Sequence, residues 1–339
     1  MRGRDLSQRV LLNANEKPDG PQQISIDAMS RVLARSGRYH DEDTEQLTTV
    51  IASAEQVRPD EVLVGCGSSE ILHCAVDAFT SPILPLITTL PSYELPVDMA
   101  SALGHPVIKV AMTADYAADV RKMVAQAEKS KGGLIYVVNP NNPTSSITKK
   151  DDIAWLVANL PANTIALIDE AYMHFADTPE MESGLTYVRQ GKDVVVARTF
   201  SKIYGMAGLR AGFAAARPGL IQKMEPFRNN VISIVSARAV LAAIADKKLV
   251  PERKATLGRT RSEICAWLRT KGVHYLEPQG NFLMIDVGRD TRDFGREMAQ
   301  RGVAVGRPFP PLDHMLRVTV GTDAEMAKFR DVFWVVYGA

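Results

Sequence analysis

The middle of the chain alternates short apolar runs with amphipathic stretches, and this alternation constrains the fold more than any other feature. Apolar runs at 133–138, 164–168, 193–197 and 209–216 each fit a buried strand, and residues 153–160, between two of them, fit a helix. Continuous apolar strands separated by helices indicate a mostly parallel sheet that is covered by helices on both faces. We therefore predict an α/β fold.

The pattern changes near residue 236. A long helical stretch is followed by fewer strands that alternate with helices, which suggests a small α+β domain. By fold analogy, we expect the first thirty residues to pack against this domain. A chain of 339 residues also suits one large domain and a smaller one. We predict a large domain at 31–235 and a small domain made of 1–30 and 236–339.

Composition and charge exclude several functions. The 40 basic and 39 acidic residues give a formal charge of +1 and are spread along the chain, so neither nucleic acid nor a membrane surface is indicated as a partner. The most apolar window, 81–95, is interrupted by three prolines. The three cysteines, Cys66, Cys74 and Cys265, fit a reducing compartment and form no CxxC pair. We expect a cytoplasmic protein without a bound metal.

Polar residues cluster where the predicted strands end. In open α/β sheets the ligand binds beyond the carboxyl ends of the strands. The polar residues at those ends here are Asn141, Asn142, Asp169, Tyr172, Ser201 and Lys202. This convergence predicts a ligand site at that edge of the sheet.

The segment 199–212 carries the most specific signal for chemistry. It reads Thr-Phe-Ser-Lys-Ile-Tyr-Gly-Met-Ala-Gly-Leu-Arg-Ala-Gly. A lysine held in a pocket can lose its proton and attack an aldehyde, which Lys202 would do here. The hydroxyls of Thr199 and Ser201 and the guanidinium of Arg210 suit a phosphate dianion. A surface loop with a solvated lysine is the alternative for an isolated Ser-Lys pair.

This segment resembles the active-site lysine motif of the fold-type I aminotransferases that use pyridoxal 5′-phosphate (PLP). The resemblance extends over most of the chain and is closest to the histidinol-phosphate aminotransferase group. It implies a large PLP-binding domain, a smaller α+β domain and a homodimer. It also implies that Lys202 is the Schiff-base lysine and later the general base.

The resemblance also assigns the residues around the cofactor ring. The strand Ile165–Asp169 ends on a carboxylate, and PLP needs a carboxylate at its pyridine nitrogen, which implies this role for Asp169. Tyr172 and the side-chain amide of Asn142 are the implied partners of the phenolic oxygen. Tyr93 is implied to stack on the ring. Each feature alone also fits a solvated strand end, a turn or a half-buried tyrosine.

Further motifs suit the anionic groups of the ligands. Residues 65–70 read as a Gly-rich turn that opens a helix, so Gly67, Ser68 and Ser69 could bind a phosphate at the helix N-terminus. The resemblance implies that Tyr39 reaches the cofactor phosphate of the neighbouring subunit. Arg317, whose fork matches a carboxylate, would hold the α-carboxylate of the substrate.

Besides His40, which replaces the usual proline, and the milder departure at Ser69, two further positions depart from the group. Ser145 stands where most relatives have glycine. Gly306 stands where the group has an arginine that binds the substrate phosphate, and Arg307 follows it. The segment with Asn15 resembles the stretch that covers the active site in the group. Arg307 and Asn15 are therefore expected to contact the substrate.

We predict an aminotransferase of amino-acid metabolism. It would move an amino group from an L-amino acid or a histidinol-phosphate-like donor to a 2-oxo acid, with 2-oxoglutarate a plausible acceptor. An amino-acid decarboxylase or oxidase on the same fold is the alternative, because the cofactor site is shared among these classes. A non-catalytic PLP-binding regulator is a third reading.

Overall fold

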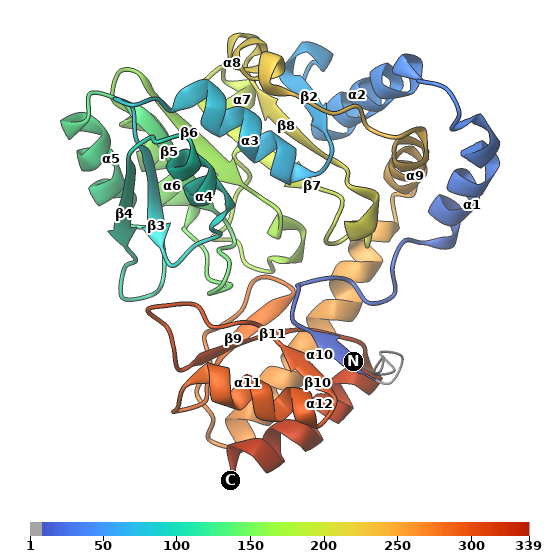
Figure 1. Cartoon of the computed structure of the whole chain (residues 1–339), viewed down its shortest axis with the longest axis vertical. Coiled ribbons are helices and arrows are strands. Elements are labelled where there is room, and N and C mark those ends of the chain that lie inside the picture. The colour runs from blue at the N-terminus through green and yellow to red at the C-terminus, as the bar shows by residue number, and fades with distance from the viewer. Residues whose placement is uncertain (1–8, 339) are drawn as a thin grey trace.

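The computed structural model describes residues 9–338, and its largest element is a seven-stranded sheet (Figure 1). The strand order is β2–β8–β7–β6–β5–β3–β4. The pairs among β3 to β7 are parallel, whereas β8 runs antiparallel to both of its neighbours, so the predicted mostly parallel sheet is confirmed. The strands are β2 Val62–Gly65, β3 Leu86–Leu90, β4 Val107–Ala111, β5 Gly133–Val138, β6 Thr164–Asp169, β7 Val194–Thr199 and β8 Gly212–Ala216.

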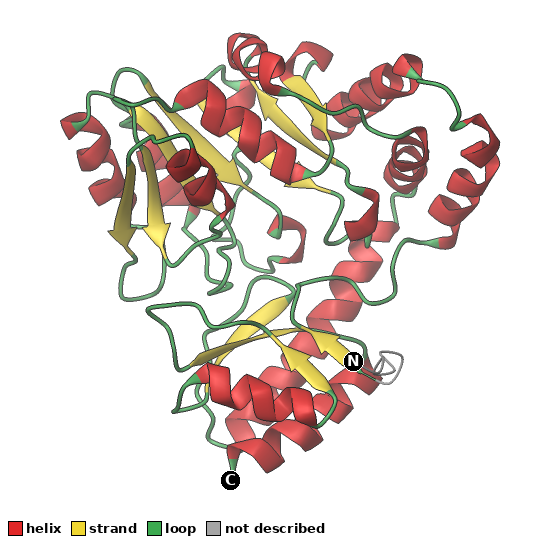
Figure 2. Ribbon diagram, in the orientation of Figure 1, coloured by secondary structure: helices red, strands yellow, loops and turns green. Residues whose placement is uncertain are grey.

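Helices cover both faces of this sheet (Figure 2). Along β5, Ile135 and Val137 join the core on one face, and Leu134, Tyr136 and Val138 join the core on the other. This alternation explains why a fully buried strand reads as an unbroken apolar run. One face packs on α2 Asp41–Glu55, α5 Val120–Lys129, α6 Lys150–Ala158, α7 Leu185–Arg189 and α9 Ile234–Ala245; the other packs on α3 Ser68–Phe79, α4 Leu95–Ala102 and α8 Pro218–Met224.

Strand β8 begins three residues later than the apolar run suggested. Ala207–Leu209 forms a short 3-10 helix, and Arg210 follows it with a φ of 54° in the left-handed region. The chain therefore turns sharply before Gly212, and the strand starts only there. The apolar residues before the turn are not part of the sheet.

The small domain has a separate core. Strand β1 Val10–Leu12 pairs in parallel with β10 Val303–Val305, and β9 Phe282–Asp286 pairs antiparallel with β11 Met315–Thr319. Phenylalanines from the strands and the helices fill the space between them. The helices are α10 Leu249–Thr270, α11 Thr291–Gln300 and α12 Asp323–Tyr337.

Two helices bear on the predicted domain boundaries, which place residues 1–30 and 236–339 in the small domain. Helix α1, Gln23–Val32, instead packs against α9, and α9 contributes Ala237 and Val240 to the core of the large domain. The face of α1 that meets α9 is formed by Ala28, Val32 and Ser25, whose hydroxyl donates to the Ala239 carbonyl of α9 at 3.0 Å. We propose that the large domain extends through α9 and that the chain crosses to the small domain along α10 (Figure 1).

Within residues 9–338, no helix combines the length and the apolar character needed to cross a membrane. The basic start of the chain, residues 1–8, lies outside the described residues.

Candidate active site

A cavity of about 340 Å³ lies at the carboxyl ends of the central strands and is closed by residues of the small domain. Its walls come from the ends of β5, β6 and β7, from the start of α3, and from β11. The predicted site residues that line it are Asn15, Ser68, Ser69, Tyr93, Asn142, Asp169, Tyr172, Thr199, Ser201, Lys202, Arg210, Arg307 and Arg317.

Lys202 follows β7 and reaches into this cavity. Its Nζ donates a hydrogen bond to the Ala14 carbonyl at 3.2 Å. The same nitrogen lies 5.6 Å from the centre of the Tyr172 ring. The amine therefore sits between the large domain and the N-terminal segment, with no carboxylate paired to it in the described part of the chain.

Asp169 is the last residue of β6 and is almost fully buried. The Tyr136 hydroxyl donates to its Oδ2 at 3.0 Å, and the Ala171 amide donates to its Oδ1 at 3.1 Å. Burial raises the pKa of Asp169 to about 6, and the hydrogen bond from Tyr136 opposes that rise. A cationic partner in the cavity would stabilise the charged carboxylate.

The start of α3 and Arg210 form an anion cup. Ser68 and Ser69 are the first residues of the helix, whose N-terminal amides have no acceptor within the helix. The Arg210 guanidinium donates to Ser69 Oγ and to Ser201 Oγ, each at 3.3 Å. An added Cβ at Gly67 would lie 2.5 Å from Arg210 Nη2, so only glycine leaves room for this arrangement.

Arg317, on β11, is a buried cation without a counter-ion. Its Nη1 donates to Asn142 Oδ1 and its Nη2 to the Asn13 carbonyl, both at 2.7 Å, while Nε has no hydrogen-bond partner. No carboxylate in residues 9–338 forms an ion pair with it. Burial lowers the pKa of Arg317 to about 10, which leaves it charged at neutral pH. A buried unpaired charge of this kind calls for an anionic ligand.

Asn142, Asn15 and Tyr172 join the two domains at the cavity. Asn15 Nδ2 donates to the Tyr172 hydroxyl at 3.2 Å, and its Oδ1 accepts from Thr319 Oγ1. Asn142 Oδ1 is bound by Arg317, which leaves its Nδ2 as a donor. All three side chains are buried, so their orientation is fixed by the fold.

Arg307 and Tyr39 lie at the edge of the site or away from it. The Arg307 guanidinium forms an ion pair with Glu94, and both side chains are about half exposed. It also lies 4.3 Å from the ring centre of Phe309. Tyr39 is 90% exposed and does not line the cavity of its own chain.

The two departures from the group have structural consequences. At Gly306, an added Cβ would lie 2.8 Å from the Arg317 carbonyl oxygen, so a side chain there would displace β11. Ser145 has a φ of 61°, in the region that favours glycine. Its Oγ accepts a hydrogen bond from the Gly280 amide at 2.7 Å and so ties the large domain to the small one.

Sequence reasoning missed three residues near the site. Tyr136 supports Asp169, Glu94 pairs with Arg307, and Phe309 lies 4.6 Å from the Arg317 guanidinium. Only Tyr136 left a signal, as the single polar side chain in an otherwise apolar strand. Glu94 and Phe309 lie in loops whose approach depends on the tertiary fold.

A group of possible metal ligands lies away from the cavity. Atoms of His40, Glu42 and Asp43 come within 4.8 Å of one another. Arg35 and Arg238 already pair with the carboxylates of this group. The cluster is therefore explained as a network of ion pairs.

Comparison with known proteins places the chain in a family. Residues 7–333 match the family described as aminotransferase class I and II. The chain belongs to the class I and II aminotransferases. This membership confirms the predicted PLP-dependent transaminase of fold type I and does not favour a decarboxylase or oxidase.

Named relatives of this aminotransferase point to one group. A histidinol-phosphate aminotransferase of Moorella thermoacetica is 30% identical over 94% of this chain and 83% of that protein. One of Anaeromyxobacter sp. (strain Fw109-5) is 31% identical over 97% of this chain and 91% of its own length. A crystal structure of histidinol-phosphate aminotransferase from Sinorhizobium meliloti, in complex with PLP, has a TM-score of 0.89 at 25% identity and covers 97% of this chain and 91% of that chain. The predicted resemblance to this group is confirmed.

The cavity of this aminotransferase fits PLP. The carboxylate of Asp169, the amine of Lys202 and the cup around Arg210 offer a partner for a ring nitrogen, an aldehyde and a phosphate. Gly67 keeps the cup open because a side chain there would collide with Arg210. The individual roles of these residues stay predictions.

Proposed function

We propose that this aminotransferase moves an amino group from histidinol phosphate, or from an L-amino acid, to a 2-oxo acid such as 2-oxoglutarate. The observation that carries this proposal is the unpaired, buried guanidinium of Arg317 at the end of a cavity that also holds Lys202 and Asp169. Both donors place an anion, a carboxylate or a phosphate, close to the carbon that bears the amine. The names of the relatives support histidinol phosphate.

The cofactor supplies one property, an electron-accepting ring that stabilises negative charge at the carbon bearing the amine. In our proposal, Asp169 keeps the ring nitrogen protonated, and Tyr136 and the Ala171 amide hold that carboxylate in place. Lys202 anchors the cofactor, and its Nζ, once free, takes the proton from the substrate carbon and returns it. The Asn142 amide and the Tyr172 hydroxyl orient the ring oxygen.

The other end of the cavity would bind the substrate. Arg317 holds the carboxylate of the amino acid or oxo acid with two parallel hydrogen bonds, and Asn15 closes the site over it. Gly306 stands where the group has a phosphate-binding arginine. Arg307, the next residue, takes over this role and attracts the substrate phosphate at the mouth of the cavity. Asn142 and the Asn13 carbonyl occupy the Arg317 guanidinium until the substrate arrives.

A donor screen tests this function. The purified holoenzyme is mixed with histidinol phosphate, histidine, phenylalanine or aspartate without an acceptor, and the conversion of the cofactor to its amine form is followed by absorbance. We expect fast conversion with histidinol phosphate and slower conversion with at least one amino acid. Failure of every donor to convert the bound cofactor would contradict the proposed substrate classes, whereas carbon dioxide or peroxide release would contradict transamination.

We further propose a homodimer with shared active sites. Tyr39 is 90% exposed, and Ile24 and Leu33, on and just after α1, are also exposed apolar side chains. If a partner subunit covers this surface, Tyr39 reaches the cofactor phosphate in the cavity of that partner subunit. Such an isologous arrangement needs the same patch on both subunits.

Subunit mixing tests this arrangement directly. We expect the Lys202→Ala and Tyr39→Ala chains to be inactive or weakly active when each is alone. In a mixed dimer, the site with an intact Lys202 receives Tyr39 from the other chain, so we expect activity to return on mixing and refolding. Activity that stays at the level of the two separate variants would contradict a shared site.

We also propose that the protein works in the cytoplasm. Cys66, Cys74 and Cys265 form no disulfide in the structure, which suits a reducing compartment. Fractionation of cells that express the full-length protein tests this proposal, and recovery in a secreted fraction would contradict it.

A further inference from the structure

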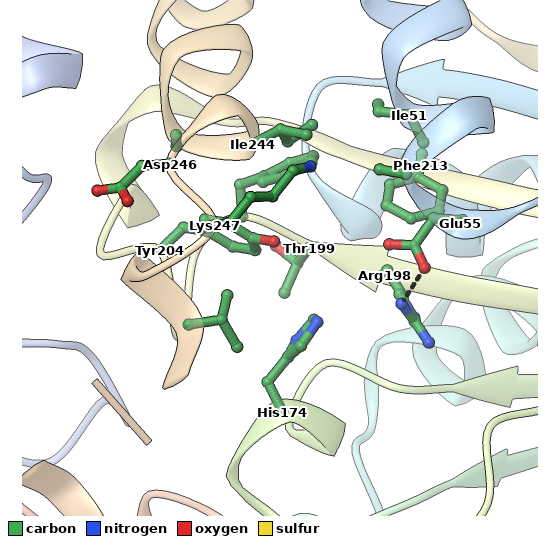
Figure 3. Close-up of a pocket in the computed structure, with 14 residues that line it drawn as sticks. Ile51, Glu55, His174, Arg198, Thr199, Tyr204, Phe213, Ile244, Asp246 and Lys247 are labelled. Atoms are coloured by element: carbon green, nitrogen blue, oxygen red, sulfur yellow. Dashed lines mark hydrogen bonds and ion pairs between the residues drawn. The ribbon is translucent and has the colours of Figure 1, made fainter. Parts of the chain in front are cut away.

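A second cavity, of about 270 Å³, lies where the large domain continues into α10 (Figure 3). We call it the hinge cavity. It shares Thr199 with the active-site cavity, and its rim includes Lys247, in the joint between α9 and α10, and Val250, at the start of α10. A molecule bound there would contact both the end of β7, before Lys202, and the helix that reaches the small domain.

Aromatic side chains form the inner wall of the hinge cavity. The ring of Phe200 lies 4.9 Å from that of Tyr204 and 6.0 Å from that of Phe213, measured between ring centres. Ile51 and Ile244 complete the apolar surface. A pocket with mostly apolar walls and a few polar groups is typical of small-molecule sites, and the ring faces suit a flat aromatic group.

An excess of negative charge borders the cavity. The Arg198 guanidinium binds Glu55 at 2.7 Å and Glu170 at 2.9 Å, so two carboxylates share one cation. The side chains of Glu170 and Arg198 are 1% and 6% exposed, and that of Glu55 is 20% exposed. Of the two carboxylates bound to Arg198, Glu55 lines the cavity, which favours a cationic group beside it. Asp246, next to Lys247 in the chain, also lines the cavity.

Three other polar groups at the cavity have no partner in the described part of the chain. The Tyr204 hydroxyl and the His174 imidazole make no hydrogen bond within residues 9–338, and the Lys247 amine, which Figure 3 shows at the cavity, forms no ion pair there. Burial raises the pKa of Tyr204 to about 12 and lowers the pKa of His174 to about 3, so both are neutral at pH 7. The Tyr204 hydroxyl and the His174 imidazole are half-buried and can bind a ligand or ordered water, and the exposed Lys247 amine can meet an anion at the mouth of the cavity.

We propose that the hinge cavity binds a small aromatic amino acid in its zwitterionic form, with the ring against Phe200 and Phe213, the ammonium at Glu55 and the carboxylate at Lys247. A ligand of this class has a group for each part of the cavity: a ring for the apolar wall, a cation for Glu55 and an anion for Lys247. Binding is coupled to catalysis through α10, because Arg253 on this helix donates to the Ile203 carbonyl at 3.0 Å, next to Lys202.

The experiment uses the holoenzyme and the betaine of phenylalanine, whose quaternary nitrogen cannot form an imine with the cofactor. Calorimetry is expected to show saturable binding while the cofactor absorbance stays unchanged. Removing either charge from the probe, as in 3-phenylpropionate or phenylethyltrimethylammonium, is expected to weaken binding about tenfold. The variants Lys247→Met and Glu55→Gln are expected to weaken binding of the betaine by about the same factor.

A matched pair of variants locates the bound probe. Ala54 lines the hinge cavity and is exposed, so Ala54→Phe blocks the mouth at little risk to folding, whereas the exposed neighbour Ser53 does not line it. We expect Ala54→Phe to abolish binding, Ser53→Phe to retain it, and both to keep the activity measured without the probe. Absence of saturable binding to the wild type, or binding that survives Ala54→Phe, overturns the site.

Coupling to the active site has its own readout. Saturation with the betaine is expected to change kcat/KM of the wild type about fivefold and to leave kcat/KM of Ala54→Phe unchanged. A change below twofold in the wild type overturns the coupling, and an equal change in both proteins shows competition at the active site and overturns the assignment to the hinge cavity.

Discussion

The active-site cavity has two halves that are built in different ways. In our proposal, the cofactor half contains Asp169, Lys202 and the cup around Arg210, which lie at the ends of strands of one sheet or at the start of a helix. The proposed substrate half contains Asn15, Arg307 and Arg317, which come from the N-terminal segment, a loop and a strand of the small domain. The residues of the cofactor half are positioned by a single sheet, whereas those of the substrate half are positioned by the packing of several separate segments.

The two halves also differ in how their charges are paired. In the cofactor half, Lys202 has no acidic partner in the described residues and Asp169 is held by two donors, so the groups are ready for a ligand. In the substrate half, Arg317 is bound to Asn142, and Arg307 is paired with Glu94. Substrate binding therefore replaces existing contacts, and changes in this half should have the smaller effects.

The largest effect is expected for Lys202→Ala. Loss of both the anchor and the proton-transfer group should lower kcat by roughly 10⁴-fold. Steady-state assays at saturating donor and acceptor measure this loss. Because the amine of Lys202 makes one hydrogen bond within residues 9–338, to the Ala14 carbonyl, the thermal stability of the apoprotein should change little. A variant that keeps a tenth of the wild-type activity would place the chemistry elsewhere.

Asp169→Asn should lower activity and raise stability. Without the carboxylate, kcat is expected to fall by roughly 10²- to 10³-fold. Burial raises the pKa of Asp169 to about 6, so the folded apoprotein binds a proton more readily than the unfolded chain and loses stability as the pH rises from about 4 to about 6. Replacing the buried charge should therefore stabilise the apoprotein at pH 7 by up to about 3 kcal/mol.

Urea unfolding of the two apoproteins at pH 4 and pH 7 measures this difference. The free energies of unfolding should be close at pH 4 and should diverge at pH 7 in favour of the variant. A wild type that is the more stable protein at pH 7 would show that Asp169 is not strained by its burial.

Arg317→Gln should act on the substrate half alone. Loss of the charged fork is expected to lower kcat/KM for 2-oxoglutarate about 100-fold, chiefly through KM, while PLP affinity stays within twofold. Arg317→Lys keeps the charge but not the fork, so its kcat/KM for 2-oxoglutarate should lie between those of the wild type and Arg317→Gln. Equal losses of PLP affinity and substrate affinity would contradict the separation of the two halves.

The smallest effects on kcat/KM are expected for Arg307→Gln and Glu94→Gln, and these two effects should have opposite signs. Both side chains are about half exposed, so their charges are screened. We expect Arg307→Gln to lower kcat/KM for histidinol phosphate about fivefold and Glu94→Gln to raise it about threefold, with little change for phenylalanine. Effects of the same sign in both variants would show that the pair acts through structure instead of charge.

The sequence predicted the cofactor half well because its residues follow periodic elements. Strand β5 lies at 133–138 as expected, and β6 and β7 end within two residues of the expected positions, at Asp169 and Thr199. The ends of parallel strands share one edge of the sheet, so the polar residues after them had to meet. The roles that the family resemblance gives to these positions stay predictions.

The substrate half and the domain boundaries were harder to predict. Glu94 and Phe309 lie in loops, and no local pattern encodes their approach to Arg307. The hydrogen bond from Gly280 to Ser145 likewise joins residues far apart in the chain. Helix α9 is apolar on several sides and could have packed on either domain, and its tertiary contacts with α1 and α2 support our proposal that it belongs to the large one.

The proposed role of Lys202 is tested most directly by finding which lysine carries the cofactor. The purified holoenzyme is reduced with borohydride, digested and mapped by mass spectrometry, with Lys202→Ala treated in the same way. We predict that the reduced cofactor is attached to Lys202 in the wild type and to no lysine in the variant. Attachment to a different lysine, or an adduct that persists in the active site of Lys202→Ala, would contradict it.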